Sequence, residues 1–275
     1  MCRLLNYPRA TFYRKTKAHK DKIDESIIRE AVVASFNSSK GNYGSRRIKV
    51  DIANKNGLQV SRRRIRRIMK ENFLISTYQD VQFKVCHKVK EVNRENITNV
   101  IDRRFNNRLI HEVLISDLTY IRIGHKVAYI CCIEDLFNRE IVGWSIGYKK
   151  TPSLVLKAFL SITSFSLEDV TYFHTDRGSE FKNEEIDNLL KAYNIRRSLS
   201  NPGVPYDNAC METLYNKIKI EFVKGRSFPD YYSCVRDFFE YVHWYNYERI
   251  HEGINYMTPI AYKEMMSKSN CLKNC

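Results

Sequence analysis

The chain has 275 residues, of which 43% are hydrophobic, and a formal net charge of +15. It lacks an apolar run long enough to span a membrane and an apolar stretch typical of a signal peptide, and its 18 Tyr and 14 Phe exclude a wholly disordered chain. We therefore expect a cytoplasmic globular protein whose eight cysteines are reduced thiols.

The positive charge is confined to the first part of the chain. Residues 1–110 hold 26 Lys and Arg against 10 Asp and Glu, whereas residues 111–275 hold 20 against 21. A basic segment joined to a near-neutral globular part favours a polyanionic partner, with nucleic acid first. A solubilising surface is the alternative explanation of the same composition.

Residues 1–76 are predicted to form a basic helical domain. Residues 1–20 are predicted to form a short basic helix or arm. Residues 24–37 have apolar side chains at helical spacing and are predicted to form a helix. A second, shorter helix contains Ile48 and ends before Gly57, because glycine commonly follows the last turn of a helix.

The third predicted helix, residues 61–72, is the most basic of the group. We expect Ser61 to cap it, its isoleucines to face the core and its arginines to face solvent. Two helices joined by a tight turn, the second of them basic, are typical of a helix-turn-helix DNA-binding domain, although an Arg-rich helix can also be a solvated face. The residues expected to contact DNA are Arg46, Arg47, Arg62, Arg63, Arg66 and Arg67.

A polar, basic connector is predicted over residues 77–110, and an α/β core over residues 111–265 with a tail at 266–275. Three strands come first in the core, and helices and strands then alternate, which is the element order of a ribonuclease-H-like fold. The predicted strands are 112–122, 126–134, 139–147, 169–174 and 195–199, and the predicted helices are 153–165, 183–193, 208–224 and 231–247.

Three acidic residues in the core are candidates for metal ligands. Asp117 interrupts an apolar strand, Asp176 follows another strand beside a glycine turn, and Glu212 lies near the start of the helix predicted over 208–224. Each also has an ordinary explanation, as an outward-facing strand residue, a turn aspartate and a solvated helix residue. Carboxylates fixed on rigid elements are nevertheless what magnesium-dependent phosphodiester cleavage requires.

The helical repeat sorts the residues around Glu212. At 100° per residue, Asn208 and Lys219 share its face, whereas Glu221 lies on the opposite face. We expect Glu221 to point toward solvent or the following helix, so that replacing it by Gln costs about 0.5 kcal/mol, as at a surface site.

Three other polar residues have supporting roles in this interpretation. Asp207 is expected to cap the helix of Glu212, and Asn208 either to cap that helix or to orient the site. His174 either contacts DNA or ends its strand with a satisfied hydrogen bond.

The segments LISDLTYI around Asp117, HTDRGSEF around Asp176 and PGVPYDNACMETLYNKIKIE around Glu212 resemble the catalytic signature of the insertion-sequence-three family of bacterial transposases. Thirty-five residues separate Asp176 from Glu212, which is the spacing of the family's DD(35)E motif, and Lys219 matches a basic residue seven positions after the glutamate. The segments KGNYGSRRI, IEDLFNREIVGW and WYNYERIHEGINYMTP extend the resemblance over nearly the whole chain. Glu180 stands where Gln is common, which adds a negative charge near the site.

The resemblance implies cleavage of DNA at insertion-sequence ends followed by strand transfer. Asp117, Asp176 and Glu212 would hold two Mg²⁺ ions, with Mn²⁺ as a substitute, and Lys219 would meet a DNA phosphate. The implied partners are double-stranded DNA at the element ends and target, further copies of the chain on that DNA, and a first-frame protein or fusion, all at the bacterial nucleoid. The alternatives are a ribonuclease-H-type nuclease without strand joining and a non-catalytic DNA-binding regulator.

Overall fold

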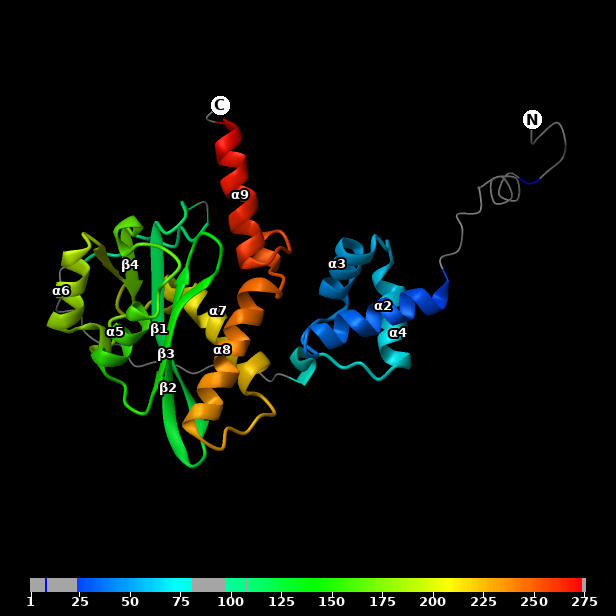
Figure 1. Cartoon of the computed structure of the whole chain (residues 1–275), viewed down its shortest axis with the longest axis horizontal. Helices are drawn as coiled ribbons and strands as arrows, with labels where there is room; N and C mark the ends of the chain where they lie inside the picture. The colour runs from blue at the N-terminus through cyan, green and yellow to red at the C-terminus, as the bar shows by residue number, and fades with distance from the viewer. Residues whose placement is uncertain (1–7, 9–23, 81–96, 107, 274–275) are drawn as a thin grey trace. The chain divides into compact units, whose positions relative to one another are not determined.

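The structure, a computed structural model, describes Pro8 and residues 24–80, 97–106 and 108–273, and it divides into two compact units (Figure 1). The first unit is residues 1–76 and the second is residues 77–275. Apart from Pro8, the basic helix or arm predicted at residues 1–20 lies outside the described residues. Within the described ranges, no helix combines the length and the apolar composition needed to cross a membrane.

Three helices form the first unit: α2 (Glu25–Ser38), α3 (Ser45–Asn56) and α4 (Arg62–Glu71). Gly57 ends α3 with a φ of 68°, a conformation that favours glycine, and the Ser61 side chain caps α4 by accepting a backbone N–H. The three helices pack around branched apolar side chains, namely Ile28, Val32, Ile48, Ile52, Ile65 and Ile68. The predicted helix–turn–helix order of α3 and α4 is therefore present.

A five-stranded sheet in the order β3-β2-β1-β4-β5 forms the centre of the second unit. Its first three strands, β1 (Val113–Ile123), β2 (Lys126–Asp135) and β3 (Ile141–Gly147), are antiparallel neighbours. The short strands β4 (Tyr172–Thr175) and β5 (Arg196–Leu199) are added in parallel on the other side of β1. This is the ribonuclease-H-like arrangement predicted from the element order.

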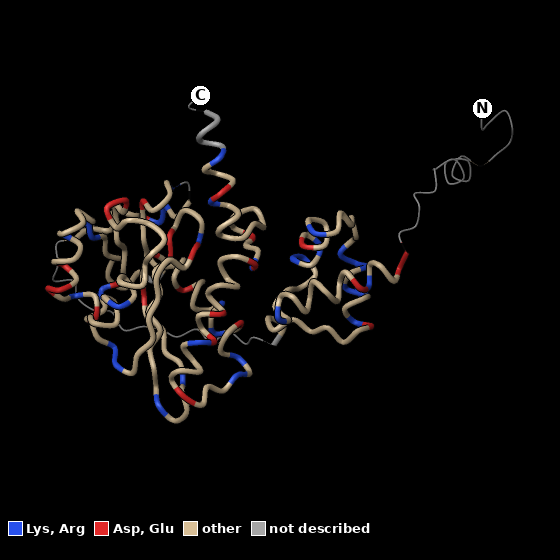
Figure 2. The backbone as a smooth tube through the Cα atoms, in the orientation of Figure 1, with Lys and Arg blue, Asp and Glu red and all other residues tan. Residues whose placement is uncertain are grey.

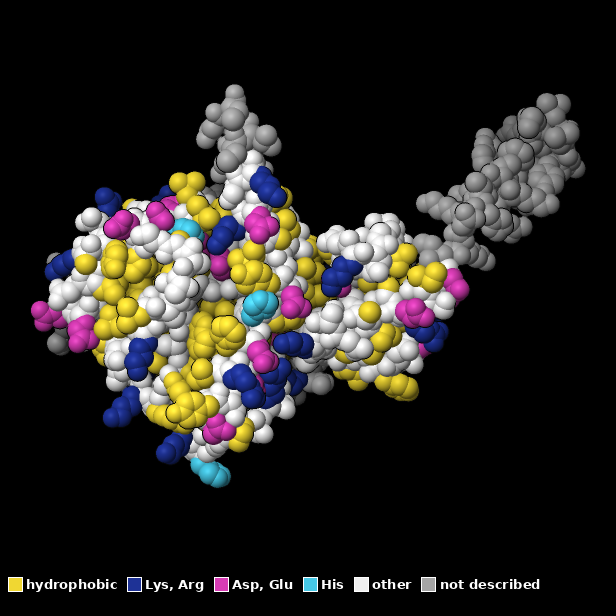
Figure 3. All heavy atoms as spheres, viewed as in Figure 1, with side chains coloured by type: hydrophobic (Ala, Val, Ile, Leu, Met, Phe, Trp, Pro, Cys, Tyr) yellow, Lys and Arg dark blue, Asp and Glu magenta, His cyan; other side chains and the backbone are white. Residues whose placement is uncertain are grey.

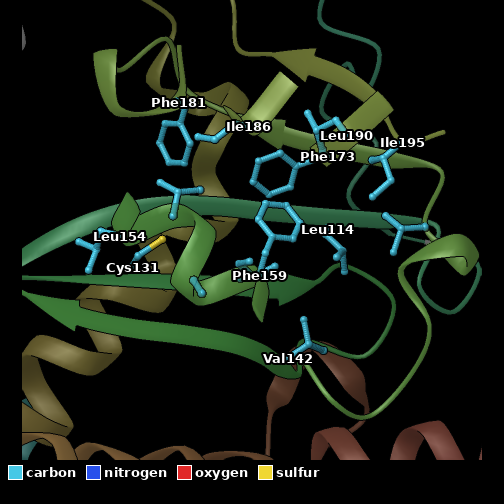
Figure 4. Packing of buried hydrophobic residues seen from close by; sticks show 14 residues of the cluster. Leu114, Cys131, Val142, Leu154, Phe159, Phe173, Phe181, Ile186, Leu190 and Ile195 are labelled. Atoms are coloured by element: carbon cyan, nitrogen blue, oxygen red, sulfur yellow. The ribbon is translucent and has the colours of Figure 1, made fainter. Parts of the chain in front are cut away.

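Helices α5 (Pro152–Leu160) and α6 (Glu184–Ala192) cover one face of the sheet. Side chains alternate along a strand, so every second residue of β1 and β2, including Leu114 and Cys131, points into this layer. There they pack against residues of the two helices, among them Phe159, and of β4, as Figure 4 shows.

The opposite face carries α7 (Ala209–Ile218) and α8 (Tyr231–Tyr247). Trp144 of β3 packs edge-on against Phe238 of α8, with ring centroids 5.1 Å apart. In Figure 1 the two helices lie on the side of the sheet away from α5 and α6. The sheet is therefore enclosed between two helical layers.

Two features of the C-terminal part differ from the prediction. The helix predicted over 208–224 stops at Ile218, and Lys219–Val223 forms a π-helical turn, η5. A last helix, α9 (Pro259–Lys273), occupies most of the segment interpreted as a tail. Five short 3₁₀ helices complete the described elements: η1 (Thr77–Asp80), η2 (Leu167–Asp169), η3 (Ser179–Phe181), η4 (Pro205–Asn208) and η6 (Glu252–Ile254).

The described ends of the stretch interpreted as a connector pack against the sheet unit. Lys224 Nζ donates a hydrogen bond of 3.1 Å to the backbone oxygen of Thr77. At the other end, Ile101 is buried and the N–H of Val100 donates to Ser198 Oγ at 3.0 Å. Both ends thus contribute to the compact unit of residues 77–275.

Candidate active site

Asp117 and Asp176 lie at adjoining positions of neighbouring strands. β1 and β4 run parallel, and Ser116 is paired with Thr175, the last residue of β4. The residues that follow this pair therefore start about 4.8 Å apart, the usual separation of strands in a sheet. The tertiary structure thus brings together two acids that are far apart in the sequence.

Asp117 lies on the sheet face that α7 and α8 cover. Its partner across the β1–β2 ladder is Cys132, which is paired in turn with Trp144. The hydroxyl of Tyr215 reaches between the two strands, where it accepts the N–H of Cys132 at 3.1 Å and donates to the backbone oxygen of Asp117. This bridge fixes α7 to the backbone of Asp117, and Glu212 lies three residues before Tyr215 on the same helix.

Glu212 and Lys219, which were predicted to share a helix face, are both exposed, whereas Asn208, assigned to the same face, is buried. Lys219 follows the end of α7, and its Nζ lies 5.2 Å from the centre of the Tyr120 ring of β1. Among the residues described here, no three His, Cys, Asp or Glu side chains lie close enough together to hold one metal ion. The three predicted ligands are therefore not gathered around one point in this conformation.

The turn after β4 orients Asp176. The N–H of Gly178 donates to Asp176 Oδ1 at 2.9 Å. The side chain of Glu180 folds back over this glycine, so that a Cβ on Gly178 would lie 2.4 Å from Glu180 Oε1. A side chain at position 178 would therefore have to displace the Glu180 carboxylate.

Glu180 is a buried carboxylate with a lysine partner. It is 2% exposed, and its Oε1 lies 2.9 Å from Nζ of Lys150, at an ion-pair distance but without the angles of a hydrogen bond. Desolvation lowers the pKa of Lys150, but Glu180, followed by Asp176 and Asp117, raises it by more, so that it lies above its usual value. Lys150 is therefore within electrostatic reach of both aspartates.

His174 lies inside the protein. Its Nδ1 is 2.9 Å from Ser198 Oγ, its Nε2 is 3.1 Å from the backbone oxygen of Asp207, and its side chain has no exposed surface. Burial lowers the pKa of His174 to about 4, so the ring is neutral at pH 7. Of the two predicted roles of His174, the structure supports the second: the ring ends its strand with satisfied hydrogen bonds, which link β4 to the segment before α7.

Asp207 does not cap α7, contrary to the prediction. Its carboxylate accepts hydrogen bonds from Arg103 Nε at 2.8 Å and from the N–H of Asn201 at 2.9 Å. The 3₁₀ turn η4 moves the N-cap position of α7 to Asn208, whose side chain makes no capping hydrogen bond. Asn208 is 6% exposed, and its Oδ1 is buried without a hydrogen-bond partner in the part of the chain described.

Glu221 is buried, so the expectation of a surface site was wrong. Its Oε1 lies 2.6 Å from Nη2 of Arg249, and its carboxylate also accepts hydrogen bonds from Tyr78 and, at 3.1 Å, from Tyr241 of α8. The direction toward the following helix was predicted correctly. The π turn and the arginine that lies beyond α8 account for the burial, and neither has a signal in the helical repeat.

The candidate DNA-binding arginines of the first unit differ in their partners. Arg67 pairs with Glu25 and, at 3.6 Å, with Glu71, and it shares these carboxylates with Arg64 and Arg29. Arg63 and Arg66 of α4 are exposed without an ion pair among the described side chains, as is Arg46 of α3, whereas Arg47 and Arg62 are half-buried. Figure 2 marks the basic residues along α3 and α4.

On the face of the second unit seen in Figure 3, basic and acidic side chains are interspersed, in keeping with its near-neutral charge.

Three residues with a positioning role were not predicted: Tyr215, Lys150 and Arg249. A tyrosine on an amphipathic helix looks like any core residue, and an arginine 28 positions from its carboxylate has no local signal. For Lys150 a signal did exist, because an extra acid at Glu180 calls for a compensating cation in the fold.

Family models match most of the chain in three segments. A model described as an HTH-like domain matches residues 22–80. Two models described as an integrase core domain match residues 110–205 and 193–259, which include all three candidate carboxylates.

The similar proteins include the transposase for insertion sequence element IS904 of Lactococcus lactis subsp. lactis (strain IL1403), 28% identical over 254 residues, with 90% of this chain and 98% of that protein covered. The putative transposase InsK for insertion sequence element IS150 of Escherichia coli (strain K12) is 23% identical over 264 residues, covering 96% and 92%. Among solved structures, the HTLV-2 integrase catalytic core domain in complex with magnesium is 18% identical, with 56% of this chain and 97% of that chain covered and a TM-score of 0.41.

Proposed function

We propose that this chain is a transposase of the insertion-sequence-three family, which cleaves DNA at the ends of an insertion sequence and joins the exposed 3′ ends to target DNA. The observation that carries the proposal is the parallel pairing of Ser116 with Thr175, which sets Asp117 and Asp176 side by side. The Tyr215 bridge supports the assignment of Glu212 as the third carboxylate, because it holds α7 against β1, the strand of Asp117.

A divalent metal fits the donor set at this edge of the sheet. Carboxylate oxygens are the ligands that Mg²⁺ and Mn²⁺ prefer. One turn before Glu212, the Oδ1 of Asn208 is a further polar atom, buried without a hydrogen-bond partner among the described residues. We assign Asp117, Asp176 and Glu212 as ligands of two ions. When bound, such ions activate the attacking oxygen and stabilise the leaving oxygen at phosphorus.

The protein's own groups orient the two aspartates through the backbone. The N–H of Leu118 donates to Asp117 Oδ1 at 2.7 Å, and the N–H of Gly178 donates to Asp176 Oδ1 at 2.9 Å. Each carboxylate is thereby fixed in its plane before a ligand arrives, which lowers the cost of organising the site. Glu212 completes the ligand set from α7 after a rearrangement of its exposed side chain.

In the proposal, basic side chains of both units bind DNA, each at a different part of the substrate. In the proposal, the helix-turn-helix of α3 and α4 binds the duplex at the element end, with Arg46, Arg63 and Arg66 as its phosphate contacts. Lys219 meets a phosphate beside the carboxylates, where its exposed ammonium group lies over Tyr120. Two element ends brought to one target require at least two copies of the chain on the DNA.

The test is metal-dependent nicking and joining of a labelled duplex that carries an element end. Mg²⁺ and Mn²⁺ should support both steps, whereas Ca²⁺ should permit DNA binding with little chemistry, because its larger and looser shell positions the attacking oxygen poorly. Asp117→Asn, Asp176→Asn and Glu212→Gln should each lower nicking by several orders of magnitude, while Glu240→Gln, an exposed residue of α8, should not.

Each alternative predicts a different result in this assay. A ribonuclease-H-type nuclease would cut hybrids and would not join strands, and a regulator would bind the duplex without cutting it. Full nicking in excess chelator, or full nicking by Asp117→Asn, would overturn the proposal.

A further inference from the structure

We propose that Lys150 and Glu180 form a positioning pair in which Lys150 holds the Glu180 carboxylate against the turn of Asp176, so that a fourth acid beside the metal site is neutralised and kept out of the ligand set. The inference rests on the proposed function, because it concerns the ion that Asp117 and Asp176 would bind. The pair would adjust the electrostatic potential at the metal site, which the three predicted ligands do not do by themselves.

The geometry connects Glu180 to Asp176 through one glycine. Gly178 donates its N–H to Asp176 Oδ1 at 2.9 Å, and the Glu180 carboxylate occupies the space that a Cβ on the same residue would take. Any movement of the Glu180 side chain therefore changes the packing of the turn that orients Asp176.

Burial makes this carboxylate dependent on Lys150. Glu180 is 2% exposed, and neither of its oxygens has a hydrogen-bond donor among the described residues, so the ion pair with Lys150 at 2.9 Å is what compensates its charge. A buried carboxylate without compensation is strongly unfavourable and turns toward water or a cation. The side chain of Lys150 is 45% exposed, so it contacts both the buried acid and solvent.

The charges of the pair cancel at the place where a cation would bind. Lys150 interacts electrostatically with Asp176 and Asp117 as well as with Glu180. With both members present, their opposite charges largely offset each other in the field that a divalent ion would meet. If either member loses its charge, that field changes by one unit, and the change has opposite sign for the two members.

The closing experiment measures Mn²⁺ binding to the full-length chain without DNA, by electron paramagnetic resonance of the free ion at constant ionic strength. Glu180→Gln leaves Lys150 uncompensated and should weaken Mn²⁺ binding by roughly threefold or more. Lys150→Met frees the acid and should strengthen binding by a similar factor. The double variant Lys150→Met/Glu180→Gln should return to within about twofold of the wild-type Kd, and Lys150→Arg should match the wild type, because both restore the charge balance.

The opposite changes in the Kd for Mn²⁺ distinguish a positioning role of the pair from a merely structural one. If the pair only stabilised the fold, both single variants would melt earlier and leave the Kd for Mn²⁺ unchanged, which would overturn the inference. The double variant and Lys150→Arg keep the test valid if Lys150→Met fails to fold. Asp117→Asn is the second control: if it abolishes Mn²⁺ binding while the pair variants have no effect, only this inference falls. If Asp117→Asn binds Mn²⁺ like the wild type, the proposed metal site is wrong and the inference is overturned with it.

Discussion

Arg249 Nη2 lies 2.6 Å from Glu221 Oε1, and the two side chains are 1% and 0% exposed. The pair joins the π turn after α7 to the segment after α8, and Tyr78 and Tyr241 complete the hydrogen bonds of the carboxylate. Breaking a buried ion pair at one partner leaves the other charge uncompensated. The pair therefore fixes the C-terminal end of α7, the helix that carries Glu212, away from the candidate active site.

Glu221→Gln should destabilise the protein by about 3–5 kcal/mol, because Arg249 would remain buried without a counter-charge. Urea unfolding measures this change, and Glu212→Gln is the matched control, since Glu212 is exposed on the same helix. The control should unfold like the wild type while losing nicking. Equal unfolding midpoints for the two variants would contradict the burial of Glu221.

Tyr215→Phe should reduce both stability and cleavage. It removes the hydroxyl that bridges Cys132 N–H and the backbone oxygen of Asp117, and with it two buried hydrogen bonds that contribute about 0.5–1.5 kcal/mol each. Nicking should slow beyond what partial unfolding explains, because the strand at Asp117 is released from α7. Tyr206→Phe, at a position 70% exposed, is the control, and equal unfolding of the two variants would argue against the bridge.

The arginines of α4 should contribute unequally to duplex binding. Arg63→Ala with Arg66→Ala should lower the slope of log K against log salt by about 0.9 for each lost phosphate contact. Arg67→Ala should change the slope less than either of these arginines, because its side chain already pairs with Glu25 and Glu71. The measurement is fluorescence anisotropy of a labelled duplex over a salt series. A larger effect of Arg67→Ala than of the double variant would contradict this division among the arginines.

The stability contributed by His174 should be lost as the pH falls. Its folded-state pKa of about 4 lies below the ordinary 6.5, so the unfolded chain takes up the proton first. The contribution is fully present above about pH 6.5 and disappears between pH 6.5 and 4, a change of about 3 kcal/mol.

Buried Glu134 and Asp135 oppose this trend in the wild type, because burial raises their pKa values to about 7 and about 6. The comparison with His174→Asn isolates the histidine. The difference in unfolding free energy between wild type and variant should shrink from pH 6.5 to pH 4 in urea titrations. A difference that is constant over this range would mean that the ring is not held neutral.

The sequence by itself determined the type and order of most elements, because alternation along a strand and the 3.6-residue repeat of a helix are local properties. The strands around Asp117 and before Asp176, the capped helix that begins at Arg62, and the glycine that ends α3 all follow from neighbouring residues. The spacing of the acids likewise indicated the family, since it depends only on position in the chain.

The tertiary structure alone decided which distant residues meet. Whether Ser116 pairs with Thr175, and thus whether Asp117 adjoins Asp176, depends on the register of two strands that are separated by two others in the sequence. The burial of Glu221 depends on a π turn that breaks the helical repeat, and the contact of Lys150 with Glu180 joins a loop before α5 to a turn after β4. Such contacts are fixed by the packing of whole layers and the compensation of buried charge, which no local periodicity encodes.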